Sequence, residues 1–209
     1  MLNTVQVNGV QVVWHTHRAV ERRPVAHRRS DVVEAALRIL DTYGLADLTM
    51  RRLAADLEVR PSALYHHFSD KQNLLAAVAD AIVERGPRVQ APAGARWDEV
   101  FVLAAHALRD TLLAFRDGAE VVATAHAFGL GSADPRAGLE AALEGLEPSV
   151  VDTAARTTLL FVLGHVQAEQ LHMHAGSTGA RVGRGVEGAA TFRAGLEVVV
   201  AGLRAELRV

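Results

Sequence analysis

The sequence contains no cysteine, few aromatic residues and no long apolar run. Without cysteine, the chain cannot be a disulfide-stabilised scaffold, a cysteine zinc finger, an iron–sulfur protein or a thiol enzyme. No stretch approaches the roughly 20 apolar residues that span a bilayer, and polar residues interrupt the N-terminal segment, so we predict a cytoplasmic protein. Half of the residues are hydrophobic and 22% are charged, a composition typical of a globular protein.

The net charge of −2 is unevenly distributed along the chain. The first 29 residues carry five arginines and one glutamate, a charge of +4, and the remainder is acidic. We therefore predict a basic N-terminal extension over residues 1–29 that could lie in a DNA minor groove; its arginines are Arg18, Arg22, Arg23, Arg28 and Arg29. Within it, residues 4–12 alternate apolar and polar side chains around Asn8-Gly9, which predicts a β-hairpin; the alternative is a disordered extension or a start codon placed too early.

From residue 30 onward, apolar residues recur every three or four positions, which predicts an all-α protein. An N-terminal domain of three helices and a following long helix is expected over residues 30–86, with helices at about 31–43, 50–57, 61–68 and 71–85. The segment 86–94 is rich in Gly and Pro and marks a boundary. A second helical domain is expected over residues 95–209, with helices at about 96–115, 118–128, 134–145, 149–174 and 187–207.

The last two expected helices are the most apolar part of the chain. Residues 150–166 are apolar almost all round, and the final helix carries a continuous apolar stripe. A helix that is apolar on two faces needs two partners. These helices are therefore predicted to form a dimerisation element, with the core of a simple monomer as the alternative.

Residues 49–68 have the layout of a helix-turn-helix, with a short helix, a tight turn and a second short helix. Small side chains near the start of the second helix would let the backbone approach a major groove, and the polar aromatic side chains that follow can contact phosphates or bases. Helix N-termini bind phosphate through free N–H groups. The candidate DNA contacts are Thr49, Arg51, Arg52, Pro61, Ser62, Ala63, Tyr65, His66 and His67. A purely structural helical hairpin is the alternative for a motif of this spacing.

The residues around this motif make it more specific. The string from Leu45 to Leu75, with TMRRLA, VRPSALYHHF and KQNLL, closely resembles the DNA-binding domain of the tetracycline-repressor (TetR) family. The string RDGA at 116–119 resembles the ligand-binding core of tetracycline repressors, and the segments LGHV at 163–166 and FRAGLE at 192–197 resemble their dimerisation helices. The resemblance covers about residues 30–207 and implies a dimeric DNA-binding regulator.

Carried over from that resemblance, Arg51 would read a base and Lys71 would contact the phosphate backbone. Two departures affect the details. Glu58 occupies a position where the family often has a turn glycine, and a positive φ there would cost about 1 kcal/mol. Pro61 and Ser62 occupy positions that help to select the operator, so the tetracycline operator itself is not expected.

The effector site departs further from the tetracycline repressors. Where those proteins hold a magnesium–drug chelate with polar side chains, this chain has Ala104, Val122, Ala125, Leu160 and Ala168. Magnesium needs oxygen ligands, so we expect no metal and no cofactor, and instead a largely apolar small molecule. The candidate effector-binding residues are Ala104, His106, Leu108, Val122, Ala125, His126, Leu160, Gly164, His165 and Ala168.

A second class of function rests on His165, Glu169 and His172, which lie at i, i+4 and i+7 of one expected helix. Such a spacing can bind a transition metal and would define a helical metal-binding protein or metalloenzyme; a polar surface strip is the other interpretation. A purely structural dimer would leave Arg51, Tyr65 and Lys71 without a role. The sequence shows no context for a catalytic triad or a phosphate loop. We therefore predict a non-enzymatic, homodimeric repressor that binds a palindromic operator, responds to a small molecule and has no membrane partner.

Overall fold

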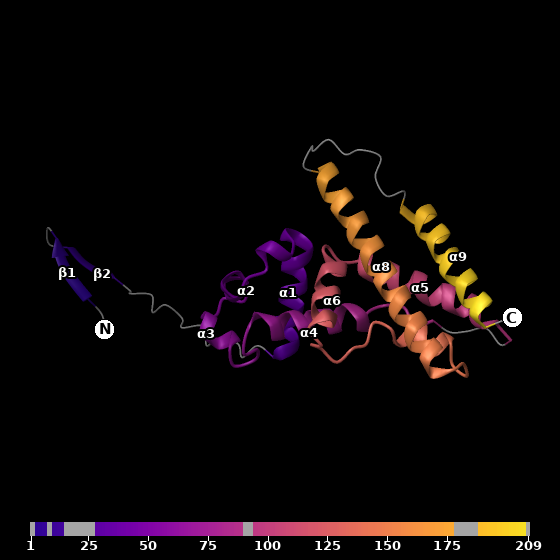
Figure 1. Ribbon diagram of the computed structural model, residues 1–209. Coiled ribbons are helices and arrows are strands. Elements are labelled where there is room, and N and C mark those ends of the chain that lie inside the picture. The colour runs from indigo at the N-terminus through magenta and orange to yellow at the C-terminus, as the bar shows by residue number, and fades with distance from the viewer. Residues whose placement is uncertain (1–2, 8–9, 15–27, 90–93, 178–187, 208–209) are drawn as a thin grey trace.

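The computed structural model describes residues 3–7, 10–14, 28–89, 94–177 and 188–207. Apart from one hairpin, the elements in this part of the chain are helical, which confirms the all-α prediction. Figure 1 shows that helices α1–α4 form one end of the helical body and α5–α9 form the other. No helix within the described ranges is long and apolar enough to cross a membrane.

The hairpin consists of β1 (Asn3–Val7) and β2 (Val10–Trp14), which pair antiparallel with Val5 opposite Val12. This pairing agrees with the predicted hairpin. The Asn8-Gly9 turn and three of the predicted arm arginines, Arg18, Arg22 and Arg23, lie outside the described residues. The role of residues 1–29 as a basic arm therefore stays a prediction.

Four helices and a short 3-10 turn build the first domain: α1 (Arg29–Tyr43), η1 (Leu45–Asp47), α2 (Met50–Asp56), α3 (Pro61–Leu64) and α4 (Lys71–Glu84). The side chains of Thr49 and Asp70 cap α2 and α4 by accepting backbone N–H groups. The predicted helix over 61–68 is wrong in length, because α3 ends at Leu64 and a turn follows. The chain turns there because Phe68 must enter the core, where it is 1% exposed, and Asp70 then starts α4.

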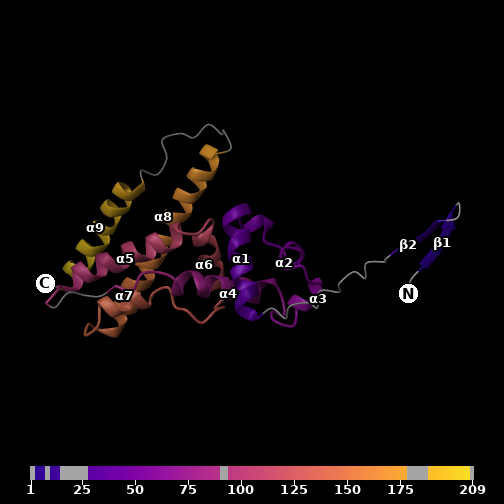
Figure 2. The ribbon, with the colours of Figure 1, turned by 180° about the vertical axis from the view of Figure 1, so that it is seen from behind.

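The second domain contains α5 (Trp97–Leu113), α6 (Gly118–Ala127), α7 (Ala137–Ala142), α8 (Pro148–Ser177) and α9 (Gly188–Glu206). The helix expected over 134–145 is also wrong in length, because the hydrogen-bonded turns on either side of α7 do not continue it. Figures 1 and 2 both show α8 and α9 side by side, with α5 next to them. Their packing is close: a Cβ at Gly195 of α9 would lie 2.6 Å from Cζ of Phe161 on α8.

Candidate DNA-binding site and effector cavity

The turn between α2 and α3 holds the helix-turn-helix in shape. The backbone N–H of Val59 donates to the carbonyl of Ala54 at 2.9 Å, and Glu58 has a φ of 54°. A left-handed conformation is thus present on a non-glycine residue, at a cost of about 1 kcal/mol. The buried side chains of Leu53, Leu64 and Phe68 join α2 and α3 to the rest of the domain.

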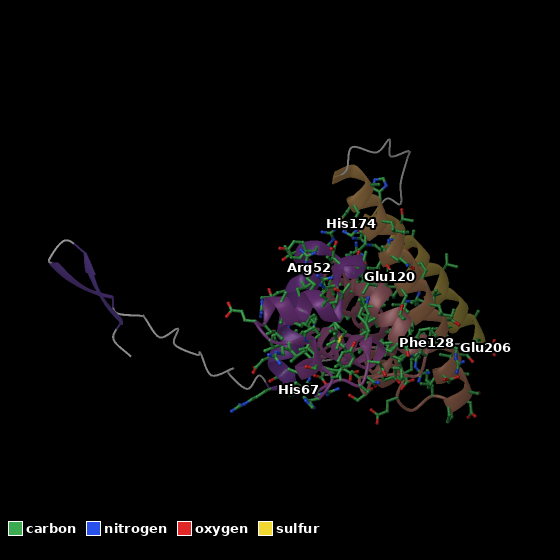
Figure 3. The ribbon with its side chains drawn as sticks, turned by 90° about the vertical axis from the view of Figure 1, so that its left-hand side faces the viewer. Arg52, His67, Glu120, Phe128, His174 and Glu206 are labelled. Atoms are coloured by element: carbon green, nitrogen blue, oxygen red, sulfur yellow. The ribbon has the colours of Figure 1, made fainter. Side chains whose placement is uncertain are left out.

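Most of the predicted DNA contacts lie at the surface of this motif. Six of them are exposed, namely Thr49, Arg51, Pro61, Ser62, Tyr65 and His66, and four are half-buried, namely Arg52, Ala63, His67 and Lys71. Figure 3 shows His67 at the surface of the domain formed by α1–α4. Within the described residues, the Arg51 side chain makes no hydrogen bond or ion pair. Its guanidinium is therefore available to an acceptor on another molecule.

Arg52 is held differently from Arg51. Its Nη1 lies 2.6 Å from Oδ1 of Asp47, and its guanidinium lies 3.6 Å from the centre of the Tyr43 ring. A DNA contact by Arg52 would compete with both of these interactions. Thr49 is likewise engaged, because its Oγ1 accepts the Arg52 N–H at 3.1 Å and so caps α2.

Two carboxylates in or next to the motif, Asp56 and Asp70, are paired or serve as a helix cap. Asp56 pairs with Arg38 at 3.2 Å, and Asp70 accepts the Asn73 N–H at 2.8 Å. The Asn73 backbone N–H and the Ser69 hydroxyl hold the pKa of Asp70 below its ordinary value. Asp70 therefore stays ionised at the start of α4, where negative charge is favoured. Among the described residues of the motif, the charged side chains without a hydrogen bond or ion pair are those of Arg51, Glu58, Arg60 and Lys71.

A cavity of about 460 Å³ lies between α4, α5 and α7. Its walls are mostly apolar, and its polar side chains are those of Glu84, Arg88, Thr111 and Asp134. Thr111 is buried and its hydroxyl donates to the carbonyl of Ala107 at 2.7 Å. The remaining lining residues are Val83, Gly86, Pro87, Val89, Val100, Ala104, Ala107, Leu108, Pro135, Ala137, Gly138, Leu139, Ala141 and Ala142.

Only two predicted effector residues, Ala104 and Leu108, line this cavity. Val122 and Ala125 are buried in the core against other helices, and His126, Leu160 and Gly164 are exposed. These last three do not line this cavity in the single chain: α8 turns residues 159, 162, 163 and 166 inward and so leaves Leu160 and Gly164 outward, and His126 is exposed near the end of α6. Their role in effector binding stays a prediction. The walls formed by residues 83–89 and 134–142 were not predicted, because these residues were expected only as the end of one helix with a following linker and as part of another helix.

The two remaining histidines lie in an aromatic cluster between α5, α8 and α9. The rings of His106 and His165 lie 5.1 and 5.2 Å from the Phe192 ring. His165 Nε2 is 3.2 Å from the Gly188 carbonyl oxygen, and His106 faces a smaller hollow of about 260 Å³. Ala168 is half-buried on α8 and outside the main cavity. His106, His165 and Ala168 therefore do not line the larger cavity.

The alternative metal site of His165, Glu169 and His172 is not formed. Both carboxylate oxygens of Glu169 accept hydrogen bonds from Nη2 of Arg109, at 2.9 and 2.8 Å. His165 Nε2 is 3.9 Å from Glu169. Within the described ranges, which include all three residues, no group of three metal-ligating side chains comes together. The metal-binding alternative is wrong because the buried Arg109 occupies the carboxylate.

A tight turn between two short helices, an exposed basic side chain, and further helices that enclose a cavity together with α4 define a helix-turn-helix regulator. Two family models agree with this class. The model described as bacterial regulatory proteins, tetR family, matches residues 32–78, and the model described as tetracyclin repressor-like, C-terminal domain, matches residues 91–187. The chain belongs to the tetR family of bacterial regulatory proteins, whose members are DNA-binding regulators and not enzymes.

Solved structures cover nearly the whole helical part. BioQ of Mycobacterium smegmatis is 43% identical, with a TM-score of 0.76 over 86% of this chain and 98% of that chain. A structure of BioQ with its natural double-stranded DNA operator is 41% identical, with a TM-score of 0.71 over 86% of this chain and 99% of that chain. The tetracycline repressor protein class A from transposon 1721 of Escherichia coli is 40% identical over 91 residues, which are 43% of this chain and 42% of that protein. The match thus spans less than half of this curated relative.

Proposed function

We propose that this protein is a homodimeric transcriptional repressor that binds a palindromic operator and is released from it by a small, largely apolar molecule. One observation carries the proposal: α4 starts at the helix-turn-helix and ends in the wall of the apolar cavity. Lys71 is the first residue of α4, and Val83 and Glu84, at its other end, line the cavity. A helix of 14 residues thus joins a DNA-reading surface to a ligand-sized space.

DNA binding is supported by the helix-turn-helix surface. Arg51 on α2 and Tyr65, directly after the end of α3, are exposed, and Lys71 is half-buried at the start of α4. BioQ, which is 41% identical in its complex, binds a double-stranded operator. One recognition helix reads only a few base pairs, so two copies related by a two-fold axis are needed for a specific site.

Dimerisation is supported by large apolar side chains on the outer faces of α8 and α9. Leu160 and Leu171 on α8 and Val198 on α9 are between 62% and 73% exposed in the single chain. Burying one such side chain stabilises an interface by about 1.5–3 kcal/mol. Contiguous patches of this kind on a monomer mark interaction sites. A second copy that covers α8 and α9 would therefore form a four-helix interface.

The effector class follows from the cavity walls. Burying a polar group without a partner costs at least about 1–3 kcal/mol, and the deep wall offers only the Thr111 hydroxyl. Glu84, Arg88 and Asp134 are exposed, so they lie at the solvent side. The favoured ligand has an apolar body and a polar end near this rim. A ligand releases DNA only if it binds one arrangement of the domains better than another.

The DNA-binding proposal is tested by selecting sites from random duplexes with the purified full chain. We expect a palindrome bound by two chains, and we expect deletion of the corresponding gene to raise transcription next to that site. Binding by one chain, or selection of no site, would contradict the proposal. A fall in transcription on deletion would make the protein an activator.

The effector class is tested by thermal shift and operator release with compounds that share an alkyl tail and carry neutral, anionic or cationic heads. We expect at least one to bind wild type, and Ala104→Phe to abolish binding because it fills the cavity. Operator affinity of this variant should stay intact. Release by magnesium and tetracycline at low micromolar concentration would contradict the apolar ligand class.

A further inference from the structure

The loop between α6 and α7 closes onto α4 through one carboxylate. Asp80, in the middle of α4, accepts hydrogen bonds from the Ser132 N–H at 2.8 Å, the Ser132 hydroxyl at 2.9 Å and the Ala133 N–H at 2.9 Å. Hydrogen bonds to an ionised acceptor are about twice as strong as those between neutral groups. A segment 52 residues away in sequence is therefore fixed to α4 at a single side chain.

Glycine at position 131 makes this contact possible. Gly131 has a φ of 92°, in the left-handed region that side chains disfavour. A Cβ atom there would lie 2.6 Å from Oδ1 of Asp80, a separation at which something must shift. The loop is also tied at its start, where the Leu130 N–H donates to the Ala125 carbonyl at 2.9 Å. Its shape is thus set by both its own backbone and Asp80.

The loop and α4, which meet at Asp80, each lead to a proposed functional site. The loop leads to the cavity, and α4 runs between the cavity and the helix-turn-helix. The loop residues after Ala133 are Asp134 and Pro135, which line the cavity. On α4, the cavity-lining Glu84 follows Asp80 by one helical turn, and Lys71 begins the same helix next to the helix-turn-helix. The Asp80 contact is the point at which the cavity wall is bonded to the helix that leads to the DNA-binding surface.

We propose that Asp80 is a positioning residue that couples the cavity wall to the orientation of α4, a role that rests on the proposed function. A molecule that displaces residues 134–135 also displaces the donors at 132–133. The Asp80 carboxylate then either follows them, which moves α4, or loses its hydrogen bonds. Both outcomes change the relative stability of two α4 positions, and such coupling acts equally in the opposite direction. Operator binding is therefore expected to change the stability of the hydrogen bonds between Asp80 and the loop.

This reciprocity permits a test without knowing the effector. Hydrogen exchange is measured on the full chain, free and bound to the duplex recovered by site selection, at the amides of residues 131–133. We expect operator binding to change exchange in wild type by about fivefold or more, the lower end of usual coupling. In Asp80→Ala, operator binding persists but the change at these amides disappears. The Leu130 amide, which donates to Ala125, reports on the fold of the loop.

A matched control and two loop variants complete the design. Glu120 is an exposed carboxylate on α6 (Figure 3), and Glu120→Gln should behave as wild type. Ser132→Ala removes one of the three donors to Asp80, and Gly131→Ala forces the loop away from it. Both should weaken the response while leaving Asp80 in place, so they test the proposal even if Asp80→Ala does not fold.

The outcomes separate this inference from the proposed function. If wild type binds the selected duplex but exchange at residues 131–133 is unchanged, the coupling role of Asp80 is refuted while the regulator proposal stands. The same conclusion follows if folded loop variants respond like wild type. If no duplex is bound by the wild-type chain, both proposals fail.

Discussion

The buried ion pair between Arg109 on α5 and Glu169 on α8 is expected to be a major determinant of stability in the part of the chain formed by α5–α9. Nη2 of Arg109 lies 2.9 and 2.8 Å from the two Glu169 oxygens, and the side chains are only 10% and 18% exposed. At an effective dielectric constant of about 20, this separation corresponds to an attraction of about 6 kcal/mol, most of it offset by desolvation. Removing one partner leaves a buried charge unpaired.

Arg109→Met should therefore cost about 3 kcal/mol, the lower end of the usual range, because the partial exposure of Glu169 lets water reach it. For a chain of 209 residues this corresponds to a fall in melting temperature of about 6–12 °C. The double variant Arg109→Met with Glu169→Leu should recover most of the loss, because no unpaired charge remains. Urea unfolding of the three proteins gives the coupling energy from a double-mutant cycle.

The control for this experiment is the exposed pair of Arg156 and Asp152 on α8. These side chains are 64% and 52% exposed and lie 3.1 Å apart, so Arg156→Met should cost less than about 1 kcal/mol. If Arg109→Met costs as little as Arg156→Met, or if the cycle shows no coupling, the argument from burial is refuted. A double variant that is as unstable as the single one would show that packing, and not charge, is responsible.

Three further predictions concern packing, pH and DNA reading. Gly195→Ala should cost about 1–3 kcal/mol in thermal unfolding because its Cβ overlaps Phe161, whereas Gly202→Ala, with no atom within 4 Å, should be neutral or stabilising; equal effects would contradict the α8–α9 packing. Hydrogen bonds from Arg204 lower the pKa of Asp98. The ionised carboxylate therefore stabilises the fold above its ordinary titration range, and this contribution to stability is lost as the pH falls through the lowered pKa. Asp98→Asn should flatten that part of a curve of stability against pH. Arg51→Ala should cost about 1–3 kcal/mol on the selected operator and much less on random DNA in binding titrations, and an equal loss on both would show a phosphate contact only.

The DNA-binding domain could be predicted closely from the sequence because its signals are local. The apolar period, the Thr49 and Asp70 caps and Pro61 at the start of α3 each act within a few residues of their own helix. The resemblance also marked the position of Glu58, which has a φ of 54°, as one where the family often has a turn glycine. The end of α3 was misplaced by one turn, because the burial of Phe68 is a tertiary demand that no local pattern contains.

By itself, the amino-acid sequence determined the family, the all-α class and the helix-turn-helix, since these depend on periodicity, caps and short motifs. The position of the cavity, and the pairing of Glu169 with Arg109 in place of a metal site, depend on tertiary packing. Because α8 is apolar almost all round, its sequence could not show that Leu159 and Val162 face inward while Leu160 faces outward. In the same way, the spacing of His165 and Glu169 allowed a metal site until Arg109, 60 residues away, was found bonded to the carboxylate. Which faces meet depends on contacts between segments far apart in sequence, and these exist only in the folded chain.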